Sequence, residues 1–241
     1  MLSLPEHGRT AAGDRALAGS LSAIAGAANA VALRAAGVFS ANVTGNVSWA
    51  ADRLAAGRWA AAGFFLAVVV AFVAGSFVCA FALAAAARRA TPGVYAACLW
   101  VESGAMAALA VACAATSSGR ALDVLCLGLA FLMGGQNALA TRLSDARVRA
   151  THLSGICTDL GISLGARADR ALHGAAVSGA ESDDDGMALR LLTVACFLVG
   201  GAFGALAYSA MGLLALLPVA AAVAVVALAG ARALVKRAAD S

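Results

Sequence analysis

Six stretches of this chain are each long and apolar enough, or nearly so, to cross a lipid bilayer as a helix. A spanning helix needs about 20 mostly apolar residues, because each residue advances the helix by about 1.5 Å. The six stretches are residues 17–36, 64–87, 94–115, 122–140, 189–210 and 213–235. The pattern predicts an all-α polytopic membrane protein with six transmembrane helices.

The composition agrees with helices embedded in lipid rather than with one soluble core. Of the 241 residues, 62% are hydrophobic and 12% are charged, whereas a soluble domain has about 45–50% apolar and about 25% charged residues. Alanine and glycine are abundant, which lets lipid-embedded helices approach closely; a GC-rich genome is the alternative cause of the alanine. No basic run with interleaved aromatic residues supports nucleic-acid binding.

The cysteines give no support for a disulfide framework, a metal site or a cofactor. None of them forms a CxxC pair, and most lie inside apolar stretches, where cysteine acts as a small hydrophobic residue. The six are Cys79, Cys98, Cys113, Cys126, Cys157 and Cys196. We therefore expect no metal and no cofactor.

The basic residues predict the orientation in the membrane. With the chain crossing six times, thirteen Lys and Arg residues fall on the side of the termini and four on the other side. The four are Arg34, Arg53, Arg58 and Arg120. The positive-inside rule then places both termini in the cytoplasm, with residues 1–16 as a cytoplasmic tail.

The two halves of the chain align with each other in three places, in the same order. The aligned pairs are residues 25–34 with 133–142, 42–46 with 152–156, and 72–75 with 197–200. The offset grows from 108 to 110 and then to 125 residues, because the second half has longer connections. Alanine-rich chains also align with themselves by chance, but three ordered matches favour a duplication.

A duplication of three helices has a geometric consequence. Three crossings are an odd number, so the second copy enters the membrane from the opposite side. We expect a first three-helix repeat at 17–117 and a second at 118–237, with a flexible acidic loop at 171–187. Many secondary transporters have such inverted repeats and bind substrate near the membrane midplane, at the repeat interface.

Two polar segments, residues 41–46 and 151–159, occupy matching places in the two halves. Each contains a hydroxyl residue followed directly by glycine, at Thr44 and Ser154. Glycine permits a break in a helix, and one unwound segment per half is typical of a midplane site. The alternative is that both are turns or helix caps at the interface. The candidate substrate-binding residues are Asn42, Thr44, Gly45, Asn46, Gln136, Asn137, Ser154, Gly155, Thr158 and Asp159.

Three polar residues inside predicted spans are further candidates. Asn29 and Asn137 are equivalent in the alignment, so they are expected at the repeat interface, where amides either join helices or contact substrate. Glu102 is the only carboxylate well inside a span. It is a candidate coupling acid that takes up a proton, or it pairs with Arg34 or an amide.

Gly200 and Gly204 form a GxxxG spacing that predicts close helix packing, either within the chain or in a homodimer. No catalytic motif is present: the chain lacks HExxH, a nucleophile elbow, a P-loop and a dinucleotide fingerprint. We therefore expect that the protein is not an enzyme.

Several motifs resemble the YoaK family of bacterial membrane proteins, a domain of unknown function. Residues 39–46 (Phe-Ser-Ala-Asn-Val-Thr-Gly-Asn) and 72–75 resemble its first half, and residues 133–138 (Met-Gly-Gly-Gln-Asn-Ala) and 151–155 resemble its second half. The likeness extends over roughly residues 17–235. It implies a six-span protein of the bacterial inner membrane and supplies no activity.

The chain departs from similar proteins at two positions. They tend to carry an acid at the position of Asn29 and threonine at the position of Ser154. If that acid carries a proton in its relatives, the substitution by Asn29 puts the same role in doubt here.

These patterns favour a small secondary transporter or permease for a small molecule or ion. The main alternative is a non-transporting membrane scaffold or sensor, in which the polar residues are structural. An enzyme acting on lipid has less support because no nucleophile, base and orienting group occur together. A pore lacks the expected rings of like charge.

Overall fold

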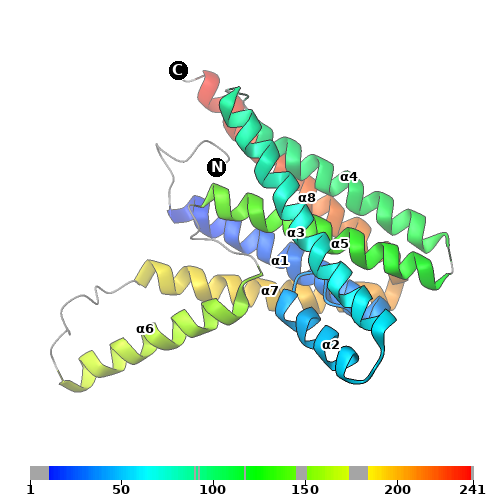
Figure 1. The fold of residues 1–241 in the computed structure, drawn as a ribbon. Coiled ribbons are helices and arrows are strands. Elements are labelled where there is room, and N and C mark those ends of the chain that lie inside the picture. Colours follow the sequence, from blue (N-terminus) through cyan, green and yellow to red (C-terminus); the bar gives the residue numbers. More distant parts are fainter. Residues whose placement is uncertain are drawn as a thin grey trace.

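The computed structural model describes residues 11–89, 91, 93–116, 118–144, 151–173 and 184–239, and all regular elements within them are helical. In chain order they are α1 (Ala11–Ala36), α2 (Val43–Ala55), α3 (Trp59–Arg88), α4 (Val94–Ala114), α5 (Gly119–Leu143), α6 (Leu153–His173), α7 (Asp184–Met211), the short 3₁₀ helix η1 (Gly212–Ala215) and α8 (Leu216–Ala239). Figure 1 shows the longer helices crossing one another in a bundle. The predicted all-α class is confirmed for these residues.

Five segments of the described residues are long and apolar enough to cross a membrane, as expected of a multi-pass membrane protein. They are Arg15–Ala36, Trp59–Arg88, Val94–Ala114, Gly119–Leu143 and Asp185–Arg232. The last segment is 48 residues long and contains both α7 and α8. The predicted fifth stretch therefore lies in α7, and the predicted sixth begins within η1 and continues along α8. Gly212, the first residue of η1, adopts a φ of 58° that favours glycine.

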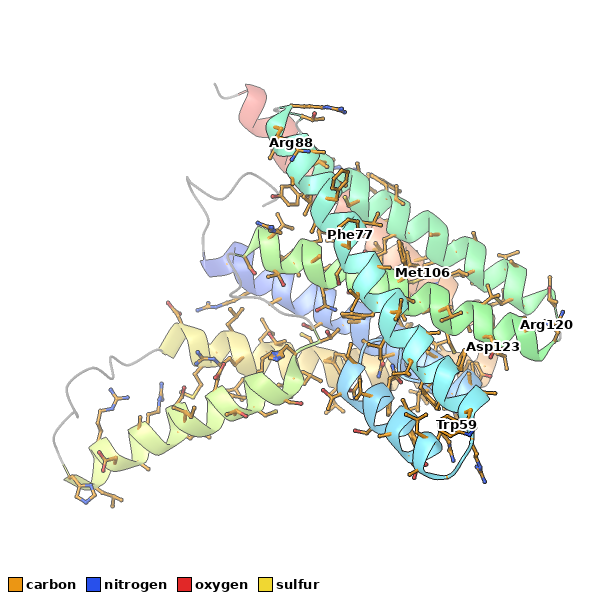
Figure 2. All side chains as sticks on the ribbon, in the orientation of Figure 1. Trp59, Phe77, Arg88, Met106, Arg120 and Asp123 are labelled. Carbon is orange, nitrogen blue, oxygen red and sulfur yellow. The ribbon has the colours of Figure 1, made fainter. Side chains whose placement is uncertain are left out.

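Basic residues lie at the ends of α3 and α5, whereas the middle of α3 is apolar. Figure 2 shows Arg88 at one end of α3 and Trp59 at the other, with Phe77 between them, and Arg120 at the start of α5. The side chain of Phe77 is 67% exposed although it is apolar. An exposed aromatic residue in the middle of a 30-residue apolar helix is expected to contact lipid.

Two helices were not predicted from the sequence, because residues 43–55 and 153–173 were assigned to connecting segments. The helix α2 has 13 residues and spans only about 20 Å, too short to cross a bilayer. It packs along α3, where Trp49 stacks on Phe65 at 6.2 Å between ring centroids. The helix α6 packs against α7 and buries none of its residues. A search for long apolar stretches passes over both helices.

The predicted boundaries fall partly inside helices. Of the expected N-terminal tail at 1–16, residues 11–16 form the start of α1, and residues 1–10 lie outside the described residues. Of the expected loop at 171–187, residues 171–173 end α6 and residues 184–187 begin α7, while residues 174–183 lie outside the described residues. Asp185 accepts a hydrogen bond from Arg15 at 2.7 Å and so joins the start of α7 to α1.

The most extensive helix contacts join α1 to α7 and α3 to α5, followed by α4 with α8. Glycines allow the first of these contacts. A Cβ atom at Gly26 would overlap the carbonyl oxygen of Phe197, and a Cβ at Gly200 or Gly204 would overlap the backbone of α1. The close packing predicted from the GxxxG spacing is therefore confirmed, and it lies within the chain.

The contact between α3 and α5 has the same character. A Cβ atom at Gly75 would overlap the carbonyl oxygen of Phe131, and one at Gly134 would overlap that of Phe72. The hydroxyl of Ser76 also donates a hydrogen bond to the Gly134 carbonyl at 2.9 Å. Backbone contact of this kind is how helices associate in lipid, where apolar surface gives no net drive.

Substitution of Gly26 by alanine should lower the thermal stability of the purified protein. The new methyl group meets backbone, which cannot rotate away, so α1 and α7 must separate; overpacking of this kind costs about 1–3 kcal/mol. The control is Gly104→Ala in α4, where a Cβ meets nothing within 4 Å. There alanine should leave stability unchanged or raise it by about 0.5–1 kcal/mol. Equal melting temperatures for the two variants would contradict the close contact.

Candidate functional site

The first motif segment forms the start of α2. Asn42 is the N-cap residue, and its side-chain oxygen accepts a hydrogen bond from the amide of Gly45 at 2.9 Å. Thr44 and Gly45 therefore lie in the first helical turn rather than at a break inside a long helix. This is the helix-cap arrangement, with asparagine rather than threonine as the capping residue.

The second motif segment begins α6 in the same way. The amide of Ile156 donates to the carbonyl of His152 at 3.1 Å, which closes the first turn. A Cβ on Gly155 would lie 2.7 Å from the His152 ring, and a Cβ on Gly45 would lie 2.9 Å from the Asn42 amide. Each glycine thus leaves room for the polar side chain that precedes the helix to fold over its first turn.

Two equivalent amides hold these segments in place. The side-chain oxygen of Asn29 on α1 accepts a hydrogen bond from the amide of Ala41 at 3.1 Å. The side-chain oxygen of Asn137 on α5 accepts one from the hydroxyl of Thr151 at 2.9 Å, and its nitrogen donates to the carbonyl of Met133 at 2.8 Å. Each amide therefore binds the motif segment that follows its own helix.

The starts of α2 and α6 meet at a cavity of about 290 Å³. Four of the predicted substrate-binding residues line it: Asn42 and Thr44 from the first half, and Asn137 and Ser154 from the second. The remaining lining residues are Ala41, Val43, Phe72, Thr141, Thr151, His152 and Leu153. The structure thus brings together side chains from both motif segments, about 110 residues apart in the chain.

Seven of the eleven lining residues were absent from the predicted set, among them Phe72, Thr141 and His152. A signal for His152 exists in the sequence, because it aligns with Asn42 at the offset of 110 residues. Phe72 and Thr141 lie on α3 and α5, and only the packing of these two helices brings them to the cavity.

Four predicted residues lie around this cavity without lining it. Asn46 is buried, and its side-chain nitrogen donates to the carbonyl of Phe39 at 2.7 Å. Gly45 and Gly155 lie beneath the side chains of Asn42 and His152. Thr158 is exposed on α6 and donates its hydroxyl to a backbone carbonyl one turn earlier.

Asp159 also lies away from the cavity, on the exposed part of α6. Its carboxylate is 3.9 Å from the guanidinium of Arg190 on α7, and the same guanidinium donates to Ser163 at 3.3 Å. These contacts connect α6 with α7. Asp159 therefore contacts α7 rather than the cavity.

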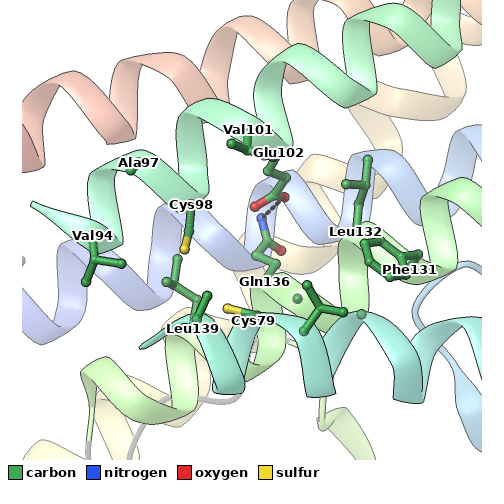
Figure 3. Close-up of a pocket in the computed structure, with 14 residues that line it drawn as sticks. Cys79, Val94, Ala97, Cys98, Val101, Glu102, Phe131, Leu132, Gln136 and Leu139 are labelled. Carbon is green, nitrogen blue, oxygen red and sulfur yellow. Dashed lines mark hydrogen bonds between the residues drawn. The ribbon is translucent and has the colours of Figure 1, made fainter. Parts of the chain in front are cut away.

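Glu102 lies in a second cavity, together with Gln136. This cavity has a volume of about 350 Å³ and lies between α3, α4 and α5. The side-chain nitrogen of Gln136 donates to the Glu102 carboxyl at 3.0 Å, as Figure 3 shows. Of the two partners considered from the sequence, the amide is therefore the one that Glu102 contacts, and Arg34 instead donates to Ser209 at 3.1 Å.

Consecutive residues of α5 face the two cavities. Gln136 lines the cavity with Glu102, whereas Asn137 lines the cavity of the motif segments. Successive residues of an α-helix point about 100° apart, so one helix can carry a polar group to each site. A shift of α5 would affect both cavities together.

The thiols give no sign of a metal centre. All six cysteines are free, and Cys79 and Cys98 line the cavity of Glu102. Within the described ranges, no group of three or more His, Cys, Asp or Glu side chains is arranged to hold a metal ion.

Comparison with known proteins gives one family. The model of a family described as "Protein of unknown function (DUF1275)" matches residues 17–229, which is most of the chain. The match agrees with the resemblance to the YoaK family. No curated protein and no solved structure matches the chain significantly.

Replacing Asn29 by alanine should loosen the first motif segment alone. The variant removes the hydrogen-bond acceptor of the Ala41 amide, and a net hydrogen bond is worth about 1 kcal/mol, or roughly fivefold in an opening equilibrium. Hydrogen exchange measured by mass spectrometry should become faster around residues 38–46. The matched variant Asn137→Ala should instead affect residues 151–157. Equal changes in both segments for either variant would contradict the separate anchoring.

Proposed function

This chain belongs to a family of proteins of unknown function (DUF1275), and we propose that it is a small secondary transporter or permease for a small molecule or ion. The observation that carries the proposal is the cavity of about 290 Å³ at which the motif segments of both halves meet. Its size suits a small solute. The lining carries an amide, an imidazole and several hydroxyl groups, which suit a polar solute rather than a lipid.

We further propose that the chain crosses the membrane six times, as two inverted repeats. The contacts of the glycines support this arrangement, because contacts between the two halves occur in pairs that are related by the sequence offsets of the aligned segments. The counterparts are Gly26–Phe197 with Gly134–Phe72, and Gly75–Phe131 with Gly200–Ala23. Such an exchange of partners is expected when a pseudo-two-fold axis relates α1 to α5 and α3 to α7.

The start of each motif helix supports a polar or anionic substrate group. Asn42, Val43 and Thr44 are the cap and first turn of α2, and residues 152–154 are the equivalent part of α6. Helix N-termini carry partial positive charge and free amide donors. In transporters with inverted repeats, helix ends of this kind point at the substrate from both halves.

Glu102 is the proposed coupling acid. It is 6% exposed and hydrogen-bonded to Gln136. Gln136 directly precedes Asn137, which lines the proposed substrate cavity. An acidic group at this depth is costly and marks a functional position by default. Movement of α5 is the proposed connection between the two sites.

We place the protein in the bacterial inner membrane with both termini in the cytoplasm, and we propose that it has no enzymatic activity. The positions of the basic residues support the orientation: Arg88 lies at the opposite end of the bundle from Arg120 (Figure 2). The positive-inside rule then assigns the end with Arg88 to the cytoplasm.

A thermal-shift screen of the purified protein against metabolites and ions tests the proposal first. A ligand that binds only the folded state stabilises it by about 2.7 kcal/mol at one hundred times its dissociation constant. Uptake of each hit is then measured in proteoliposomes. The variants Thr44→Val and Ser154→Ala remove hydroxyl groups that line the cavity, and each should weaken binding and uptake by at least about tenfold.

The control variant is Thr116→Val. The hydroxyl of Thr116 donates to the carbonyl of Ala112 at the far end of α4. The variant should retain binding and uptake. Normal uptake by the Thr44 and Ser154 variants would overturn this assignment of the substrate site.

One observation favours the second candidate, a membrane scaffold or sensor. The side-chain amides in and beside the motif segments already make hydrogen bonds within the protein. The bonds are Asn42–Gly45, Asn29–Ala41 and Asn137–Thr151. Under this alternative, alanine at Asn29 or Asn137 lowers stability, while no compound of the screen raises it. A ligand whose stabilising effect disappears in the Thr44 variant favours transport, and its uptake in proteoliposomes separates a transporter from a sensor.

A further inference from the structure

The cavity that contains Glu102 is mostly apolar and opens toward the surface that faces lipid. Val78 and Val101 lie at its edge and are 51% and 71% exposed. Both belong to apolar spanning helices, α3 and α4, so this exposure is toward the bilayer. A ligand that reaches the cavity from the membrane must therefore be largely apolar.

The interior of the cavity holds a polar pair with unused acceptor capacity. Gln136 is 1% exposed, and its nitrogen is used by the Glu102 carboxyl. Its carbonyl oxygen is buried and has no hydrogen-bond partner. Figure 3 shows this amide and the carboxyl facing each other across the middle of the cavity. A buried acceptor without a donor costs about 1–3 kcal/mol, so a donor supplied by a ligand would be stabilising.

The charge of the lining restricts the kind of donor. None of the 14 lining residues is Lys, Arg or His, and the only ionisable oxygen group is that of Glu102. A carboxylate or phosphate ligand would be repelled and would bring no donor. A primary ammonium group has a positive charge and three N–H donors, enough for both the Glu102 carboxyl and the Gln136 carbonyl.

We propose that this cavity is a binding site for an apolar primary amine that enters from the membrane. The ammonium group donates to Glu102 and Gln136, and the hydrocarbon body packs against Val94, Phe131 and Leu132. Pairing of the ammonium with the carboxylate offsets the cost of each charge at this depth. The site stands whether or not the protein transports a polar solute through the other cavity.

A free amine fits this position better than a lipid headgroup does. Glu102 is the ninth of the 21 residues of α4, about 12 Å from the start of the helix and about 18 Å from its end. The ammonium of phosphatidylethanolamine lies at the membrane surface, outside the hydrocarbon core that is about 30 Å thick. A small amine is able to reach Glu102, whereas a headgroup must leave the interface to do so.

The test measures binding of 1-adamantanamine to the full-length protein in phosphatidylcholine nanodiscs, by saturation-transfer NMR and calorimetric titration. Binding is expected for the amine and not for adamantane-1-carboxylate, which has the same body and the opposite charge. In Glu102→Gln the neutral side chain keeps its shape, and affinity should fall by at least about tenfold. Thr116→Val, which lies outside both cavities, should bind like the wild type.

A second variant tests the site without touching the polar pair. Ala97 lines the cavity and is exposed, so Ala97→Phe fills the entrance without crowding the core. It should abolish amine binding, whereas Ala112→Phe, an exposed position elsewhere on α4, should not. Wild-type affinity in folded Glu102→Gln, or equal binding of amine and carboxylate, overturns the proposal. Competition by phosphatidylethanolamine would assign the site to a headgroup and overturn the free amine.

Discussion

Contact between helix backbones is the interaction on which the bundle depends. Inside a bilayer, lipid tails solvate apolar side chains as well as other helices do, so association requires close packing and hydrogen bonds. Here Gly26 and Gly200 bring α1 onto α7, while Gly75 and Gly134 bring α3 onto α5. Both motif segments follow helices of these pairs. The position of the polar cavity is therefore a consequence of where the glycines allow the helices to cross.

The second requirement is that backbone polar groups outside regular helices find partners, because lipid offers none. Near the end of α1 this role falls to Asn29, which accepts a hydrogen bond from the backbone amide of Ala41 just before α2. Near the end of α5, Asn137 instead accepts one from the side-chain hydroxyl of Thr151 just before α6. The same bonds fix where α2 and α6 start. Structural and functional readings of these amides are thus compatible: an amide that anchors a helix start also determines the shape of the cavity beside it.

The sequence predicted the long helices well and the short ones poorly. Apolar length alone locates α3, α4 and α5, since a span in lipid needs little else. The helices α2 and α6 have mixed composition, and α6 buries none of its residues, so neither has a strong pattern. In the cavity, Asn42 and Ser154 were predictable from the repeat, whereas Phe72 and Thr141 arrive through tertiary packing that no local pattern encodes.

The two cavities differ in how their polar groups are satisfied, and this difference supports the two roles that we propose for them. Around the motif cavity, Asn42 and Asn137 already have partners, so hydroxyl groups and helix ends remain for the proposed polar solute. In the other cavity a buried carbonyl of Gln136 lacks a donor beside the carboxyl of Glu102. An unpaired buried acceptor is costly, so a donor supplied by a ligand would be stabilising there. The apolar walls around that acceptor then favour a donor that arrives with a hydrocarbon body.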